Sequence, residues 1–271
     1  MVLAKGRAKS AVPSNATSMT TVPDLKAVLR RPASLIATPL YLSESVEGLA
    51  DGAGFLNSLS ADDRQRVMAA GRRLAFTAGD AVFAQGEAHT GIFVILSGRV
   101  RVFYTGPSGR EVTLAYWTPG NFVGGPSIHQ GGTHQWSGTA IEAVEVVALS
   151  SKTLKALMES VPNFAICLIE GLEAKGRCYT AVAQMLGTRS VIERLAQLLL
   201  NLGRLYGQED GDTLKIVDMI SHDEIAALVG STRQWVTMML KRFRRDAIVT
   251  THDRTFIILR RDLLEDLVRG V

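Results

Sequence analysis

Basic and amide side chains that could contact DNA gather in one short segment, from Thr232 to Arg245. Its apolar residues Val236, Leu240 and Phe243 recur at helical spacing, which predicts a helix with one buried face. The opposite face carries Arg233, Gln234, Thr237, Met238 and Lys241. Five cations and no acid lie in this segment, namely Arg233, Lys241, Arg242, Arg244 and Arg245. Arginine and glutamine pair with base edges, and lysine contacts phosphate. An ordinary helical hairpin with a solvated basic face is the alternative.

A shorter helix is expected immediately before this segment. Ser221 and Glu224 have the spacing of a capping box, and the apolar residues Ile225, Leu228 and Val229 follow. Gly230 can end this helix, because glycine adopts a positive φ at little cost. Thr232 can then cap the second helix. Together the two segments predict a helix-turn-helix, whose second helix enters the major groove of DNA.

A β-hairpin is expected directly after the two helices. β-Branched and apolar residues in 248–260 flank a polar turn at His252, Asp253 and Arg254. A helix-turn-helix followed by such a hairpin is a winged helix. Since residues 194–271 are close to neutral overall, the positive charge is concentrated on the predicted second helix, as attraction to phosphates requires.

Composition narrows the class of protein. The chain has 271 residues, a net charge of +4 and 46% hydrophobic residues, as expected for a globular protein with more than one domain. No apolar run reaches the roughly 20 residues that span a bilayer, and residues 1–20 lack the apolar core of a secretory signal. Two cysteines, Cys167 and Cys178, cannot form a disulfide scaffold, so a cytoplasmic location is expected. No nucleophile–base pair, phosphate loop or metal-ligand spacing is evident, which argues against an enzyme and against a metal site.

The chain divides into four predicted parts. Residues 1–53 lack periodicity and are expected to be a flexible extension. Regularly spaced glycines and short apolar runs in 54–161 predict an antiparallel β-roll. Residues 162–188 form a long helix, and 189–271 form the winged helix-turn-helix.

The long helix carries apolar residues at alternating steps of three and four, as in a coiled coil. This predicted dimer seam consists of Leu168, Leu172, Lys175, Tyr179, Val182 and Leu186. A homodimer is favoured because a two-fold protein matches palindromic DNA. The alternative is that the helix packs against its own β domain.

The order of these parts resembles the cyclic-AMP receptor protein and fumarate–nitrate regulator (CRP/FNR) family of bacterial transcription factors. The resemblance rests on five blocks, GDAVFAQG at 79–86, IFVILSG at 92–98, VTLAYWTPGNF at 112–122, ERLAQLLL at 193–200 and GSTR at 230–233. It implies an α+β fold with a cyclic-nucleotide-binding-like jelly roll, a dimerisation helix and a winged helix. It further implies a cytoplasmic homodimer that binds a palindromic operator and RNA polymerase, more often as an activator.

The chain departs from the members that bind cyclic AMP. Gly125 stands where those members have a glutamate for the ribose, and no arginine occurs between Arg110 and Arg177 to hold the cyclic phosphate. The expected effector pocket is lined by Phe122, Gly124, Gly125, His134, Gln135, Trp136, Tyr179 and Thr180. We therefore do not expect this chain to bind cyclic AMP through the usual glutamate and arginine, and we expect a different effector.

Several alternatives for the effector stay open. Haem bound by His129 or His134 is one, and an apolar organic molecule near Trp117, Trp136 and Tyr179 is another. The others are a nucleotide site built from different residues, a regulator without any effector, and an adaptor that no longer binds DNA. An iron–sulfur cluster is not expected, because it needs four thiolates.

The resemblance also assigns roles on DNA. Arg233 matches an arginine that pairs with guanine, Gln234 stands where many members have glutamate, and Met238 replaces an arginine. Trp235 either packs in the core or touches a thymine methyl group. The complete expected set is Ser221, Thr232, Arg233, Gln234, Trp235, Thr237, Met238, Lys241, His252 and Arg254.

Overall fold

The computed structural model describes residues 39–44, 54–128, 131–217, 220–252 and 255–270. Its first helix, α4 (Ala61–Ala69), starts at Ser60, whose hydroxyl accepts a hydrogen bond from the Asp63 amide at 3.1 Å. This helix precedes a β-roll. None of the helices among the described residues is long and apolar enough to cross a membrane.

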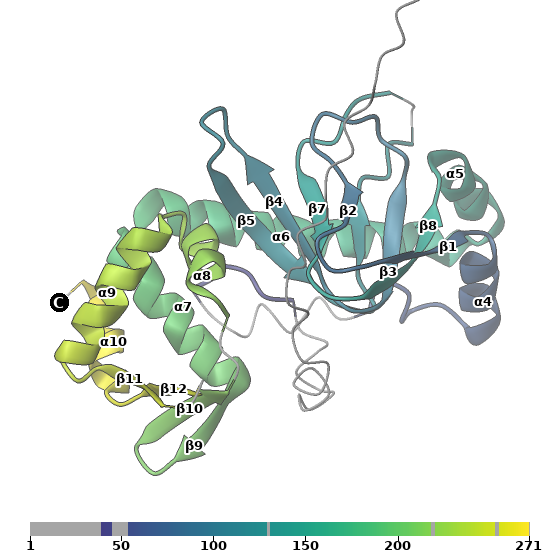
Figure 1. Ribbon diagram of the computed structural model, residues 1–271. Coiled ribbons are helices and arrows are strands. Elements are labelled where there is room, and N and C mark those ends of the chain that lie inside the picture. The colour runs from purple at the N-terminus through teal and green to yellow at the C-terminus, as the bar shows by residue number, and fades with distance from the viewer. Residues whose placement is uncertain (1–38, 45–53, 129–130, 218–219, 253–254, 271) are drawn as a thin grey trace, which may run out of the picture. The chain divides into compact units, whose positions relative to one another are not determined.

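Among the described residues, eight strands form the β-roll (Figure 1). They are β1 (Arg72–Phe76), β2 (Ala81–Phe83), β3 (Ile92–Ser97), β4 (Val100–Thr105), β5 (Glu111–Trp117), β6 (Phe122–Gly124), β7 (Ser137–Ala140) and β8 (Val144–Leu149). One antiparallel sheet has the order β1-β8-β3-β6, and the other has the order β2-β7-β4-β5. The expected antiparallel β-roll is confirmed.

Strand β3 is buried on both faces. Phe93 and Ile95 belong to the core cluster that contains Val102 of the second sheet. Ile92 and Val94 belong to a second cluster, which includes Leu154 and Phe164 of the helices that follow the β-roll. The two faces therefore fix the sheets to each other and the roll to its helices.

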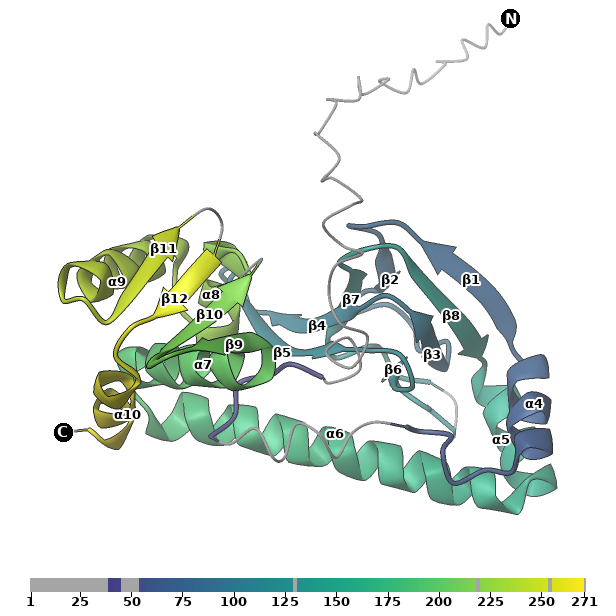
Figure 2. The same ribbon diagram turned by 90° about the horizontal axis from the view of Figure 1, so that it is seen from below.

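Helix α5 (Ser151–Ser160) leads into the 27-residue helix α6 (Pro162–Thr188). Pro162 occupies the first turn of α6, where its fixed φ and its missing N–H are tolerated. Figure 2 shows α6 running along the β-roll.

The predicted dimer seam is wrong for three of its residues. Leu168, Lys175 and Val182 are only 3%, 6% and 2% exposed, because they pack against the chain's own β-roll and core. They leave no surface for a partner helix. Periodicity showed that α6 has a buried face, but it could not show which body covers that face. Tyr179 and Leu186 are partly buried against the same core, and Leu172 is 41% exposed.

The C-terminal part combines helices with a second sheet. Its helices are α7 (Val191–Tyr206), α8 (His222–Val229), α9 (Arg233–Arg245) and α10 (Arg261–Arg269). Its strands are β9 (Gly207–Asp210), β10 (Thr213–Val217), β11 (Val249–His252) and β12 (Thr255–Ile258), in the order β11-β12-β10-β9. The expected hairpin is present as β11 and β12, whereas β9 and β10 were not predicted.

Residues 39–44 correct the expectation of a flexible extension over 1–53. Leu40, Tyr41 and Leu42 are buried, and the backbone of Leu40 pairs with Tyr116 of β5 at 3.1 and 2.8 Å. The amide of Asn201 in α7 donates to the carbonyl of Ser43 at 2.7 Å. Leu40, Tyr41 and Leu42 are three consecutive apolar or aromatic residues in a stretch without periodicity. The sequence pattern therefore did not predict that this segment pairs with a strand. The rest of that extension lies outside the described residues.

Candidate nucleic-acid interface

The turn between α8 and α9 forms as the sequence predicts. The Ser221 hydroxyl accepts from the Glu224 amide at 3.2 Å, and the Glu224 carboxylate accepts from the Ser221 amide at 2.7 Å. These two bonds satisfy amides that a helix start leaves without partners. Gly230 ends α8 with φ 63° and ψ 49°, the left-handed conformation that glycine adopts most easily. The capping box and the glycine stop are both confirmed.

Helix α9 presents one buried and one exposed face. Thr232 caps it by accepting from the Trp235 amide at 3.2 Å. Val236, Leu240 and Phe243 are at most 1% exposed, which confirms the predicted buried stripe. Met239 is buried as well and was not predicted. The buried stripe fixes the rotation of α9 about its own axis, so the polar residues must face outward.

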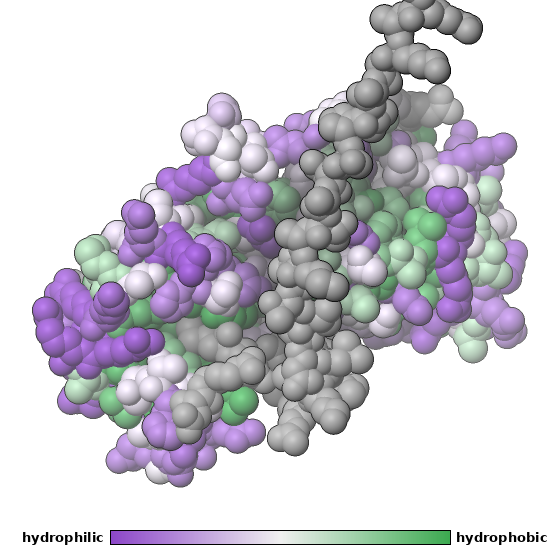
Figure 3. Space-filling model, in the orientation of Figure 1, coloured by the Kyte–Doolittle hydropathy of each residue, from purple (hydrophilic) through white to green (hydrophobic). Residues whose placement is uncertain are grey.

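The outward face of α9 holds most of the predicted DNA-contacting residues. Thr232, Arg233, Gln234, Met238 and Lys241 are exposed, and Figure 3 shows a hydrophilic surface over this helix. The Arg233 guanidinium lies 3.4 Å from the Asp223 carboxylate, and both side chains are mostly exposed. An exposed ion pair contributes little, so it does not prevent Arg233 from turning to a base.

Thr237 is half-buried, and its hydroxyl lies 2.9 Å from Nδ1 of His222. Sequence reasoning assigned no role to His222, because no local pattern links the start of one helix to the middle of the next. Burial lowers the pKa of His222 below its usual value, and the cations Arg244 and Arg233 act in the same direction. The His222 imidazole is therefore neutral at neutral pH.

The remaining predicted contacts lie around the helix. Trp235 is half-buried and packs against the domain core. Of its two expected roles, core packing and contact with a thymine methyl group, this is the first. His252 is exposed at the end of β11, while Arg254 lies outside the described residues. The Arg244 guanidinium donates to the Thr251 hydroxyl at 2.9 Å, which ties α9 to the hairpin.

The residues of the predicted effector pocket differ in their exposure. Trp136 and Tyr179 contact each other with ring centroids 5.5 Å apart, whereas Gln135 and Thr180 are exposed. Gly124 and Gly125 are buried, and a Cβ at Gly125 would lie 2.6 Å from the His89 ring. A glutamate does not fit there unless His89 moves, which agrees with the missing cyclic-AMP cassette.

His134 is 2% exposed, and its ring lies 4.3 Å from the His89 ring and 4.6 Å from the Phe83 ring, centroid to centroid. Both of its ring nitrogens lack a hydrogen-bond partner among the described residues. Burial lowers its pKa, and neighbouring His89 lowers it further. His134 lines a cavity of about 500 Å³ between β1, β2, β3 and β8. Haem ligation by His134 stays a prediction, and His129 lies outside the described residues.

A β-roll, a long helix and a winged helix-turn-helix with an exposed basic face define a DNA-binding transcription regulator. Residues 73–161 match the model of the cyclic nucleotide-binding domain, and residues 193–267 match the Crp-like helix-turn-helix domain. The chain belongs to the CRP/FNR family of transcription factors.

Curated relatives carry the names of regulators rather than of enzymes. The chain is 29% identical over 184 residues to the CRP-like cAMP-activated global transcriptional regulator of Mycobacterium tuberculosis, covering 68% of this chain and 82% of the relative. It is 27% identical over 220 residues to the cyclic AMP receptor protein of Thermus thermophilus, covering 81% of this chain and 99% of the relative.

Solved structures show the same fold. The c-di-GMP responsive global regulator CLP of Xanthomonas campestris has a TM-score of 0.66 at 21% identity, covering 73% of this chain and 99% of that one. A mutant of CooA from Carboxydothermus hydrogenoformans has a TM-score of 0.66 at 19% identity, covering 80% of this chain and 96% of that one. At these identities the likeness concerns the fold alone.

Proposed function

We propose that this regulator is a cytoplasmic homodimer that activates transcription from a palindromic operator and contacts RNA polymerase. The observation that carries the proposal is the outward face of α9, on which Arg233, Gln234 and Lys241 are exposed above a buried apolar stripe. An adaptor that had lost DNA binding would not need this face. Family membership supports the activator role.

Dimerisation is supported by the surface that α6 leaves uncovered. Ile166, Ile169 and Leu172 are 52%, 65% and 41% exposed, although large aliphatic side chains are usually buried. Their spacing by three residues places them along one side of the helix. A second α6 related by two-fold symmetry would cover these side chains on both subunits. This face keeps Leu172 of the seam that the sequence suggested and adds Ile166 and Ile169.

We propose that the effector is not cyclic AMP held by the usual glutamate and arginine, but a different molecule. The names of two relatives describe cyclic-AMP regulation, but this chain has Gly125 at the expected position of the glutamate and no arginine between Arg110 and Arg177. A buried cyclic phosphate needs a fixed cation, and a neutral histidine does not supply one. A haem-responsive or organic-ligand-responsive regulator is the alternative within this proposal.

Selection of genomic DNA fragments by the purified protein, followed by footprinting, tests the function. We expect a two-fold site whose half-sites are about 34 Å apart, one helical turn of DNA. Ile169→Glu should yield monomers in sedimentation and weak operator binding, because a charge cannot be buried between two helices without a partner. Glu159→Gln, on α5, serves as the exposed control. Selected sites without symmetry, or a dimer that survives Ile169→Glu, would contradict the proposal.

A further inference from the structure

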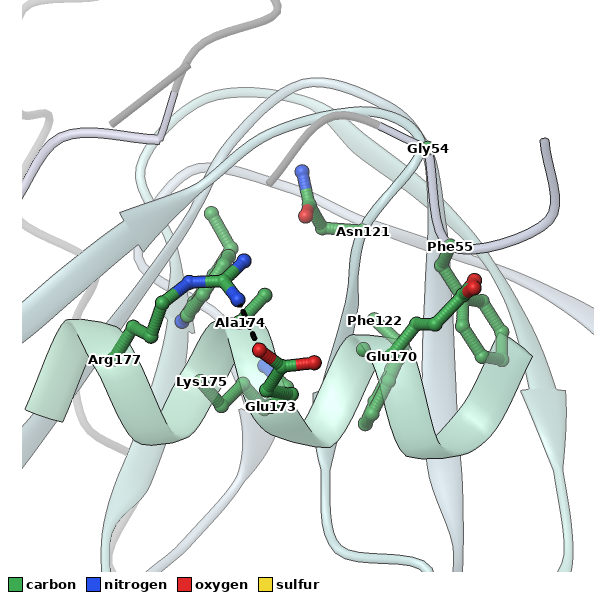
Figure 4. Close-up of a pocket in the computed structure, with 11 residues that line it drawn as sticks. Gly54, Phe55, Asn121, Phe122, Glu170, Glu173, Ala174, Lys175 and Arg177 are labelled. Carbon is green, nitrogen blue, oxygen red and sulfur yellow. Dashed lines mark hydrogen bonds and ion pairs between the residues drawn. The ribbon is translucent and has the colours of Figure 1, made fainter. Parts of the chain in front are cut away.

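A second cavity lies between α6 and the end of the β-roll, outside the DNA interface (Figure 4). Its volume is about 270 Å³. Residues from α6, from the end of β5, the start of β6 and the turn between them, and from the segment before α4 line it. They are Gly54, Phe55, Trp117, Asn121, Phe122, Glu170, Gly171, Glu173, Ala174, Lys175 and Arg177. Phe122 is its one residue in common with the effector pocket that the sequence predicts.

Lys175 is the buried cation of this cavity. Its side chain is 6% exposed, and Nζ lies 3.8 Å from the Trp117 ring centroid and 4.6 Å from that of Phe122. No oxygen of the described residues accepts a hydrogen bond from this ammonium. Arg177, by contrast, is ion-paired with Glu173 and about half exposed. Lys175 therefore brings an unmatched positive charge to the cavity.

A buried charge without an acceptor is costly. The two aromatic faces offset part of this cost through cation–π attraction, and they hold Nζ in place. They do not accept its three N–H groups as oxygen atoms would. An anion in the cavity would supply the missing acceptors.

We infer that this cavity binds a small organic monoanion, a carboxylate with a short apolar chain, through the Lys175 ammonium. The aromatic walls Phe55, Trp117 and Phe122 suit an apolar chain. Glu170 and Glu173 also line the cavity, and their charges disfavour multiply charged anions such as nucleotide phosphates. The volume is just below the roughly 300–1,000 Å³ of sites for drug-sized ligands, which favours a smaller molecule.

The charge on Lys175 makes binding depend on pH. Burial lowers the pKa of Lys175 to about 7, while the nearby Cys178 acts in the opposite direction. The other charged groups that line the cavity are Glu170, Glu173 and Arg177, all on α6, and the β5–β6 turn adds none. Since the ammonium form is required, affinity for a carboxylate should fall about tenfold between about pH 6 and pH 8.

Isothermal titration of the full-length protein with butyrate and with 1-butanol tests the inference. We expect butyrate to bind at least about tenfold more tightly than the neutral alcohol, because only the carboxylate pairs with the ammonium. Lys175→Met should reduce butyrate to the affinity of 1-butanol. Lys155→Met, at an exposed position on α5, should leave butyrate binding unchanged.

A second variant guards against a general effect of changing Lys175. Ala174→Leu keeps the ammonium but fills the cavity, so it should also abolish butyrate binding, and circular dichroism checks that both variants fold. The inference is overturned if wild-type protein does not bind butyrate, if it binds both probes equally, or if folded Lys175→Met binds butyrate as wild type does. These titrations contain no DNA, so their failure is distinct from failure of the proposed operator binding.

Discussion

Nδ1 of His222 lies 2.9 Å from the Thr237 hydroxyl, and this contact joins the first residue of α8 to the recognition helix α9. Thr237 follows Arg233 by one helical turn. The contact therefore fixes α9 relative to α8 close to the residues expected to read bases. The lowered pKa of His222 keeps the imidazole neutral at neutral pH, so that it can accept from the hydroxyl.

Acid should destabilise the protein through His134 and His222. The pKa of each is lowered in the folded state, mainly by burial, whereas the unfolded chain takes up protons near the ordinary value of 6.5. Their contribution to stability is therefore present above pH 6.5 and is lost as the pH falls below it. Urea unfolding at about pH 7.5 and pH 5.5 should show a smaller loss for the double variant His134→Phe and His222→Asn. Equal losses in both proteins would rule out this pair as the cause.

Arg233→Ala should change which operator sequence is preferred. A guanidinium that pairs with one guanine adds about 1–3 kcal/mol of discrimination at that base pair. Competition binding with operators substituted one base pair at a time measures this loss. Lys241→Ala is the matched comparison, because a phosphate contact should weaken all operators about equally and lower the salt dependence. If Arg233→Ala behaves like Lys241→Ala, Arg233 contacts only the backbone.

The DNA-binding part of the fold could be predicted because its signals are local. The cap at Ser221, the stop at Gly230 and the buried stripe through Val236 each depend on residues within a few positions of one another. By contrast, strand β9 (Gly207–Asp210) carries no apolar side chain, and the five residues of β10 (Thr213–Val217) are a short pattern on their own. Strand β10 pairs with β12, and β9 pairs with β10, and this pairing supplies what the sequence pattern lacks.

The β-roll and α6 were harder to predict because their packing joins distant residues. Spacing marked Lys175 as an interior position of a helix, but only the structure shows that Trp117 and Phe122 face it. Likewise, the sequence showed that Gly125 replaces a glutamate, whereas the His89 ring that fills this space had no local signal. Side-chain identity was therefore predictable at these positions, and side-chain surroundings were not.

Gly171→Ala should destabilise the packing of α6 against the β-roll. A Cβ at this position would lie 2.6 Å from the Phe122 ring and 3.2 Å from that of Phe55, so α6 would have to move away from the core. Overpacking of this kind costs about 1–3 kcal/mol. Gly187→Ala, in the same helix with no atom within 4 Å of its added Cβ, should instead stabilise by up to about 1 kcal/mol. Urea unfolding at one protein concentration compares the two, and a stabilising Gly171→Ala would show that Phe122 adapts freely.

Lys175→Met should remove a rise of stability with pH. In the folded protein burial lowers the pKa of Lys175 to about 7, whereas the unfolded chain holds this proton up to about pH 10.5. Between these values the unfolded state binds more protons, so raising the pH stabilises the wild-type fold. Unfolding free energies at about pH 7 and pH 9, without added ligand, should increase more for wild type than for Lys175→Met. Lys155→Met, which is exposed, should follow wild type, whereas equal increases in all three proteins would mean that the Lys175 ammonium is not desolvated.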